Sequence, residues 1–422
     1  MNTLLKMPRA SNKRQSIHTV DEAIYHAILK SLVDPSLLAD ANYHGYIEGL
    51  FIQSSYLSAS RYIVERLNGS AGRLPINSIH QFLHYPDDGF LVNFRMMPES
   101  FWALVGLLEE RGGPDYWCQN NDAGGRQGRP PHEQIAVALY TLGSPASNLE
   151  RIRMKLNIGK GTVHTYVWRT INLLASLKSE FIQWPSSQAR HQQQVDDEVF
   201  KDCVGYIDGT EIPLQYSPIK DREAYFSRKK IYGFNLQAVC NHHEQFIYAH
   251  MGATASTHDS TAFKGSLLYQ QRSLMMADHE YILGDKAYQL DKHLITPYKL
   301  PIARQAECKA FNKAHSNERI YIEHTFGVLK ARWSSLRSIP IRIRHDIEKD
   351  HLRVICWVMA CLVLHNYLSL RGEPDGWLQD DLSNESTHAE GVGEENSAMK
   401  AAGDEQRDGL REKLQEKTNL IY

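Results

Sequence analysis

The sequence predicts a mixed α/β (α+β) unit, preceded by a smaller unit made only of helices. The first observation is the order of elements between residues 200 and 333: three strand-like runs, a helix, a fourth strand-like run and a closing helix. The second is a set of three helix-like segments, separated by short turns, within residues 132–177. With 422 residues, 42% of them hydrophobic, the chain is long enough for two to three domains with their own cores.

The strand-like runs are rich in β-branched and aromatic residues, and Asn, His and Glu separate the second from the third. They lie at 203–216, 234–243, 245–254 and 281–285, and a helix begins between the last two, near 256–260. Asp208 falls within the first run, and Asp285 ends the fourth. Two aspartates are therefore expected on strands or at their ends.

The closing helix, residues 317–333, has the clearest periodicity in the chain. Ile322, Phe326, Leu329 and Trp333 recur at steps of four, three and four, which is one apolar face of an α-helix. Glu323 borders this stripe, so its carboxylate is expected at the edge of the buried face. A simply solvated glutamate, as on most helices, remains an alternative.

Asp208, Asp285 and Glu323 together form a three-carboxylate set that suits a hard divalent cation. Mg²⁺ and Mn²⁺ prefer carboxylate oxygens and retain several waters. Two such ions about 3.5–4 Å apart stabilise both the attacking and the leaving oxygen of an in-line phosphoryl displacement. Aspartates are common at strand ends, so spacing alone does not separate this site from solvated acids.

The three helix-like segments at 132–143, 149–159 and 160–177 have the pattern of a helix-turn-helix. Asn157 and Gly159 in the second turn suit a left-handed backbone conformation. The exposed face of the third segment, the expected recognition helix, would carry Lys160, Thr162, His164, Thr165 and Arg169. The alternative is an ordinary three-helix bundle that packs on the α/β unit.

Two further groups of basic residues are candidates for phosphate contacts. Arg126 and Arg129, around Gly128 and Pro130, resemble an imperfect minor-groove arginine hook, against the alternative of a polar loop that opens the next helix. Basic residues are also dense after Glu323, where Lys330 and Arg332 begin the series. A solvated basic face is the alternative for each of these residues.

The charge is unevenly distributed along the chain. The net charge is −2, but residues 373–422 carry 13 Asp and Glu against five Lys and Arg, a balance of −8 that leaves +6 on the remainder. The excess positive charge suits a phosphate backbone, and the acidic stretch is expected to be largely disordered. The six cysteines form no CxxC pair and indicate reduced thiols in an intracellular protein.

No run of about 18 apolar residues and no secretory signal is visible, so no membrane association is expected. His242–Glu244 lacks the spacing of a zinc-binding helix, so no zinc site is predicted from that motif. The predicted divisions are an N-terminal helical extension (1–89), the helical domain (90–183), a linker (184–199), the α/β domain (200–370) and the acidic tail (371–422).

Several motifs resemble those of the PIF/Harbinger-type transposases and their domesticated nuclease relatives. Asp208 in IDGTEI, Asp285 in LGDKAY and Glu323 in IEHTFGVLKARW resemble the catalytic triad of that family, in the family's order. The STHDS stretch, the run around KKIYGFNLQAV and CLVLHN near residue 361 also match. The resemblance covers roughly residues 90–370.

The resemblance implies a ribonuclease-H-like catalytic domain with a five-stranded mixed sheet and flanking helices. It implies a metal-dependent DNA endonuclease or transposase with two Mg²⁺ or Mn²⁺ ions, and a nuclear protein with a separate Myb/SANT-like partner, without which it would stay in the cytoplasm. His258 and Asp259 would either support the metal ligands or merely cap a helix. The apolar helix at 350–368 would be a core helix or the contact of a homodimer.

Two other functions fit the same sequence. A domesticated protein that binds DNA or chromatin without cutting it would need no intact triad, whereas all three acids are present here. A hydrolytic nuclease without strand transfer would use the same triad.

Overall fold

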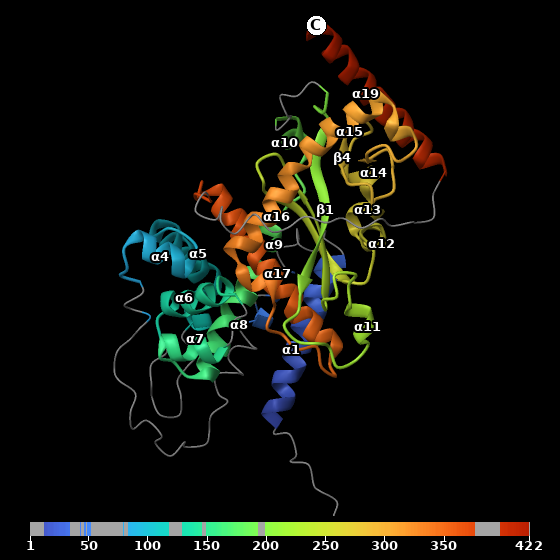
Figure 1. Ribbon diagram of the computed structural model, residues 1–422. Helices are drawn as coiled ribbons and strands as arrows, with labels where there is room; N and C mark the ends of the chain where they lie inside the picture. The colour runs from blue at the N-terminus through green and yellow to red at the C-terminus, as the bar shows by residue number, and fades with distance from the viewer. Residues whose placement is uncertain are drawn as a thin grey trace, which may run out of the picture.

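The computed structural model describes residues 12–33, 43, 46–47, 49–51, 79, 83–117, 129–145, 149–192, 199–375 and 397–421. In this part of the chain, five strands form one mixed sheet in the order β3-β2-β1-β4-β5 (Figure 1). The strands are β1 (Cys203–Pro213), β2 (Gly233–Cys240), β3 (Phe246–Thr254), β4 (Tyr281–Leu283) and β5 (Leu294–Ile295). The predicted α/β class with a five-stranded mixed sheet is confirmed.

The pairing of β1 sets the level of the two aspartates. β1 pairs antiparallel with β2 and parallel with β4, where Tyr206 lies opposite Leu283. Asp208 and Asp285 each follow two residues after these partners. Because side chains two apart on a strand share a face, the register brings both aspartates to the same level of neighbouring strands.

Helices cover both faces of the sheet. On one face lie α16 (Ile320–Arg332) and α17 (Ile347–Leu370), which share a core with Tyr206 and Leu236 (Figure 1). On the other face, Ile207 and Val239 share a second core with the segment that contains α12 (Asp259–Lys264), α13 (Leu267–Gln270) and α14 (Arg272–Met275). The alternation of side chains along β1 therefore divides its residues between two cores.

The apolar stripe of α16 is buried as predicted. Ile322, Leu329 and Trp333 have no exposed surface, and Phe326 is 5% exposed. Glu323 lies in the first turn of the helix and is exposed. α16 follows α15 (Ala306–Glu318) after the single residue Arg319.

The helical unit contains the three helices expected of a helix-turn-helix. They are α6 (Pro131–Leu142), α7 (Leu149–Leu156) and α8 (Lys160–Ser176), and α4 (Asp87–Phe94) and α5 (Pro98–Trp117) precede them. Asn157 has a φ of 51°, so it adopts the left-handed conformation expected in the turn. Gly159 does not, because its φ is −67° at the N-cap of α8. Farther upstream, α1 (Asn12–Val33) confirms a helical segment in the N-terminal extension.

α8 packs against α17, which joins the helical unit to the sheet. The rings of Trp168 and Trp357 meet edge to face, with centroids 5.9 Å apart. Among the described helices, α17 is long and apolar enough to cross a membrane by length and composition, but 78% of its most apolar window is buried inside the protein. This burial is typical of a core helix.

The expected linker at 184–199 contains a short docked helix. α10 (Ser187–Gln192) is held to the sheet domain by Arg190, whose guanidinium binds Glu280 at 2.8 Å. α9 (Lys178–Phe181) comes directly before this segment. Three short elements complete the described domain: α11 (Arg222–Tyr225) and the 3₁₀ helices η2 (Ile302–Arg304) and η3 (Ser334–Arg337).

The last part of the acidic tail is helical. α19 (Ser397–Ile421) is a helix of 25 residues that packs against α15 and β5. The Tyr298 hydroxyl donates to Asp408, and the Arg407 guanidinium lies 4.0 Å from the Tyr298 ring centroid. Leu410, which is 4% exposed, and Leu414 also pack against the main hydrophobic core, so the segment docks through both polar and apolar contacts.

Candidate metal centre

Two buried aspartates follow the parallel pairing of β1 and β4: Asp208 lies on β1, and Asp285 lies two residues after the end of β4. Asp208 and Asp285 are each 5% exposed. The Asp208 Oδ1 atom accepts a hydrogen bond from the Gly209 amide at 2.9 Å, and the Asp285 Oδ1 atom accepts one from the Ala287 amide at 2.8 Å. These local bonds fix both carboxylates in place.

Glu323 reaches the same region through Arg319, one turn before it on the chain. The Arg319 Nη2 atom lies 3.4 Å from Asp208 Oδ2 and 3.9 Å from Glu323 Oε1. Arg319 is 6% exposed, and its Nε and Nη2 atoms make no hydrogen bond within the described residues. A buried guanidinium with unused donors therefore connects one strand acid with the helical acid.

Asp259 lies on the opposite side of β1 from Asp208. Its Oδ1 atom accepts hydrogen bonds from the Asn235 and Gln237 amides, both at 2.8 Å. A Cβ atom on Gly209 would come within 2.0 Å of that oxygen, so only glycine allows this approach. Asp259 thus holds the first turn of α12 against the back of β1.

The negative charges of these acids act on one buried phenol. Burial raises the pKa of Tyr288 well above its usual value, and the charges of Asp259, Asp208 and Asp285 raise it further. The Tyr288 hydroxyl donates to Gln237 Oε1 at 2.5 Å. A concentration of carboxylates with oxygen donors alone fits Mg²⁺ or Mn²⁺, so the residues present suit the predicted metal.

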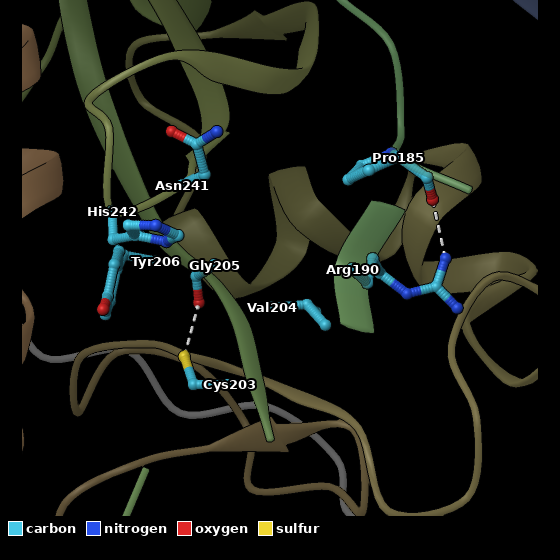
Figure 2. Close-up of a pocket in the computed structure, with 8 residues that line it drawn as sticks. All are labelled: Pro185, Arg190, Cys203, Val204, Gly205, Tyr206, Asn241 and His242. Carbon is cyan, nitrogen blue, oxygen red and sulfur yellow. Dashed lines mark hydrogen bonds between the residues drawn. The ribbon is translucent and has the colours of Figure 1, made fainter. Parts of the chain in front are cut away.

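The ligand atoms of Asp208, Asp285 and Glu323 are spaced more widely than those of a site for one ion. In the described part of the chain, one group of three metal-ligating side chains has ligand atoms all within 4.8 Å, and its members are Glu244, His324 and Asp375. The pocket in Figure 2 lies elsewhere, between α10, the start of β1 and the β2–β3 turn, and no carboxylate lines it. An open set of acids is compatible with two ions, because opposite ligands of an ion pair lie farther apart than ligands of one ion.

His258 is exposed and precedes the first turn of α12 as its N-cap residue, without a side-chain capping bond. Its Nε2 atom lies 2.9 Å from the Arg228 Nη2 atom. The imidazole is therefore directed to a basic surface loop.

The predicted recognition helix is only partly exposed. Lys160 and His164 are exposed and Thr162 is half-buried, as a DNA-contacting face would require. Arg169 is a correction, because it is 8% exposed and its Nη1 atom donates to Gln134 Oε1 at 2.5 Å. Arg169 stabilises the packing of α8 on α6 and does not face solvent.

The basic residues after Glu323 also need correction. Lys330 and Arg332 are 6% and 3% exposed, and Arg332 donates to the carbonyl oxygens of Arg95 and Pro374. Arg129 forms an ion pair with Glu133 at 2.7 Å, while Arg126 lies outside the described residues. The density of basic residues predicted phosphate contacts for Lys330 and Arg332, whereas both side chains are buried in the fold.

The sequence analysis did not identify Arg319, nor the exposed cations Arg228 and Lys286, as candidate site residues. Lys286 directly follows Asp285, and Arg228, Lys229 and Lys230 form the basic loop that Arg228 links to His258. An arginine four residues before a candidate helical ligand is a signal that could have identified Arg319.

Comparisons with known proteins agree with the motifs. Residues 207–366 match the family of DDE superfamily endonucleases. The protein named "Putative nuclease HARBI1" of Bos taurus is 28% identical over 255 residues, which are 58% of this chain and 69% of that protein. Its Homo sapiens counterpart is 27% identical over the same shares. The "Protein ALP1-like" of Arabidopsis thaliana is 24% identical over 252 residues, 56% of this chain and 60% of that protein. No solved structure matches the chain significantly. The predicted family resemblance is confirmed.

Proposed function

Because residues 207–366 belong to the DDE superfamily endonucleases, we propose that this chain is a metal-dependent DNA endonuclease whose metal ligands are Asp208, Asp285 and Glu323. The observation that supports the proposal is the parallel register of β1 and β4, in which Tyr206 lies opposite Leu283, each two residues before one of the aspartates. Arg319 then connects Asp208 with Glu323 across the gap between strand and helix.

Each acid has a distinct part in this proposal. Asp208 and Asp285 are buried and held by local amides, so they offer oxygens in fixed positions. Glu323 is exposed at the start of α16 and can turn its carboxylate toward the substrate side. Two bound Mg²⁺ or Mn²⁺ ions would supply a water of lowered pKa and offset the charge on the phosphate.

The buried guanidinium of Arg319 offsets the charge of the two acids beside it. Around the site, Lys286 and the loop Arg228–Lys230 offer exposed cations for the phosphates of the DNA on either side of the cut. On the helical unit, Lys160, Thr162 and His164 offer a second contact with the DNA. In strand transfer, the 3′-hydroxyl released by the cut would attack a phosphodiester of a second DNA and displace its 3′-oxygen, and this activity would make the enzyme a transposase.

The finer assignments follow from the same proposal. A Myb/SANT-like protein would supply sequence-specific DNA binding and entry to the nucleus, with the chain remaining in the cytoplasm without it. A homodimer would need a surface other than α17, because that helix is buried within the chain.

The second candidate function is a DNA- or chromatin-binding protein that does not cut. The exposed cations favour it, because they bind phosphates whether or not the acids hold metal. Cleavage separates the two candidates.

The test is cleavage of labelled DNA that carries the ends flanking the gene, with Mg²⁺ or Mn²⁺, by the native chain and by Glu323→Gln. Glu307→Gln, the same substitution at an exposed site on α15, is the matched control. Cleavage by the native chain and the control, lost in Glu323→Gln, supports the metal site. Equal cleavage by all three overturns the assignment, and binding without cleavage by the native chain supports the second function.

A further inference from the structure

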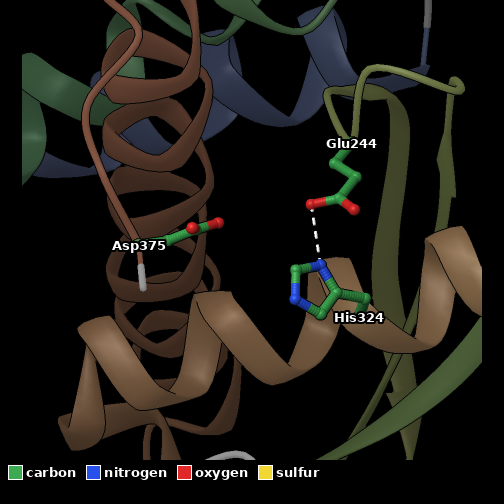
Figure 3. Close-up of side chains that lie close together, drawn as sticks. All are labelled: Glu244, His324 and Asp375. Atoms are coloured by element: carbon green, nitrogen blue, oxygen red, sulfur yellow. Dashed lines mark hydrogen bonds and ion pairs between the residues drawn. The ribbon is translucent and has the colours of Figure 1, made fainter. Parts of the chain in front are cut away.

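Three metal-ligating side chains lie close together beside α16, and none of them is a member of the predicted triad. They come from segments far apart in the chain: Glu244 from the β2–β3 turn, His324 from α16 and Asp375 from the residues after α17 (Figure 3). The His324 Nδ1 atom lies 2.8 Å from Glu244 Oε2. In Figure 3 the Asp375 carboxylate is directed toward this pair.

The backbone around Glu244 is fixed from several directions. Glu244 has a φ of 58°, in the left-handed region, and its amide donates to the Asn241 carbonyl at 3.1 Å. The Asn241 side chain accepts from the amides of His243 and Gln245. The His365 ring bonds to the Glu244 carbonyl at 2.9 Å through Nε2. The carboxylate is therefore presented from a rigid turn.

The segment that carries Asp375 is fixed as well. The Glu373 carboxylate accepts from the Met97 amide at 3.0 Å, and the Pro374 carbonyl accepts from Arg332 Nη2 at 3.0 Å. His324 is supported by α16, whose neighbouring Thr325 and Phe326 are buried. Little conformational freedom remains to be lost when an ion joins the three side chains.

The cluster attracts positive charge. The carboxylates of Glu244 and Asp375 place two negative charges beside the His324 ring. His324 and Glu244 retain 38% and 31% of their side-chain exposure, which leaves an ion a path from solvent. One imidazole nitrogen and two carboxylate oxygens suit a borderline transition metal such as Zn²⁺ better than Mg²⁺.

We propose that Glu244, His324 and Asp375 form a second metal site, which binds Zn²⁺ or a similar transition-metal ion. Ligand atoms around one tetrahedral Zn²⁺ lie roughly 3.4 Å apart, so side-chain rotation within the observed 4.8 Å closes the site. The ion takes the place of the proton between His324 and Glu244, which leaves to solvent, and water fills the fourth position. The ion ties the β2–β3 turn, α16 and the chain after α17 together, one residue from Glu323.

This inference does not rest on the proposed endonuclease function, because its readout is metal binding. The native full chain and three variants are dialysed against Zn²⁺ in excess Mg²⁺, which fills sites made of oxygen alone. Bound zinc is counted, and Co²⁺ is titrated to follow the visible absorption of an imidazole-bound ion. His324→Gln and Asp375→Asn remove one ligand each. His243→Gln, an exposed histidine of the same turn, is the matched control.

The native chain and His243→Gln are expected to bind one more Zn²⁺ than the two ligand variants, whose affinity falls by more than about 100-fold. Zn²⁺ should also raise the Tm of the native chain and not that of His324→Gln. If circular dichroism shows that one of the two ligand variants does not fold, the zinc binding of the other variant tests the proposal. Equal zinc binding and equal Co²⁺ spectra in all four chains would overturn the proposal. They would mean that His324 and Glu244 form a hydrogen-bonded ion pair and hold no metal.

Discussion

Neighbouring residues of α16 belong to two different clusters. Glu323 lies 3.9 Å from the Arg319 guanidinium, which also approaches Asp208, and the three candidate ligands of this set are all carboxylates. His324 faces Glu244 and Asp375, where a turn and a chain end supply the acids and a nitrogen joins them. In the two proposals above, the carboxylate set suits hard ions that bind substrate phosphate, whereas the mixed set suits a structural ion.

The largest effect is expected from Asp285→Asn. Removing this charge should lower Mg²⁺-dependent single-turnover DNA cleavage by about 10³-fold, because the loss of several kcal/mol of charge stabilisation corresponds to that factor. Asp278→Asn, at a side chain 95% exposed, is the control and should leave cleavage unchanged. Zinc binding at Glu244, His324 and Asp375 should persist in Asp285→Asn. Its loss there would contradict the separation of the two clusters.

The next effect concerns Arg319, the buried cation beside Asp208 and Glu323. Arg319→Met leaves Asp208 buried without its partner, which should lower the free energy of unfolding by about 3 kcal/mol. Urea unfolding without metal measures it, with exposed Arg304→Met as the control. Mg²⁺ should recover part of the loss. A stability equal to that of the native chain would show that Arg319 does not offset the acids.

A smaller effect tests how closely the sheet is packed behind Asp208. Gly209→Ala places a methyl group 2.0 Å from Asp259 Oδ1 and 2.4 Å from Gln237 Nε2, which should cost about 2 kcal/mol in urea unfolding. Gly252→Ala, also in the sheet but with nothing within 4 Å of the new methyl, should change stability far less. Similar losses in both variants would mean that the contact with Asp259 is not what requires glycine.

The last prediction concerns His315, a histidine that stays neutral. Burial lowers the pKa of His315 to about 4, and its ring bonds to the Ile295 carbonyl at 3.1 Å. The unfolded chain takes up this proton near pH 6.5, so His315 lowers stability as pH falls from about 6.5 to 4, by about 1.4 kcal/mol per pH unit. Urea unfolding of His315→Gln should show a shallower acid slope, whereas exposed His345→Gln should match the native chain. An unchanged slope in His315→Gln would mean that its ring is not held neutral.

Sequence periodicity predicted the secondary structure and the buried apolar faces. The strands, the stripe of α16 and the three helices of the helical unit follow from spacing, because apolar burial acts through repeating faces. Periodicity did not predict the burial of Arg169, Lys330 and Arg332. The acceptors of a buried charged side chain, such as Gln134 for Arg169 and the Pro374 carbonyl for Arg332, lie far away in the sequence.

The same limit applies to the sites. The order of Asp208, Asp285 and Glu323 along the chain predicted a set of acids, and the parallel register places the first two at one level. Glu244, His324 and Asp375 share no sequence spacing, so only folding brings them together. The His242–Glu244 motif lacks the spacing of a zinc-binding helix, but its Glu244 lies close to His324 and Asp375 in the folded chain.

The docking of α19 has a consequence for how the molecules behave toward one another. β5 is the last strand of the sheet on the side of β4, and α19 packs beside it, with Gly403 against the Asp291 backbone. An uncovered strand at a sheet border offers free amides and carbonyls to another chain. Because α19 packs beside β5, we expect it to hinder edge-to-edge pairing of sheets from two molecules. A chain truncated before Ser397 should therefore aggregate more readily.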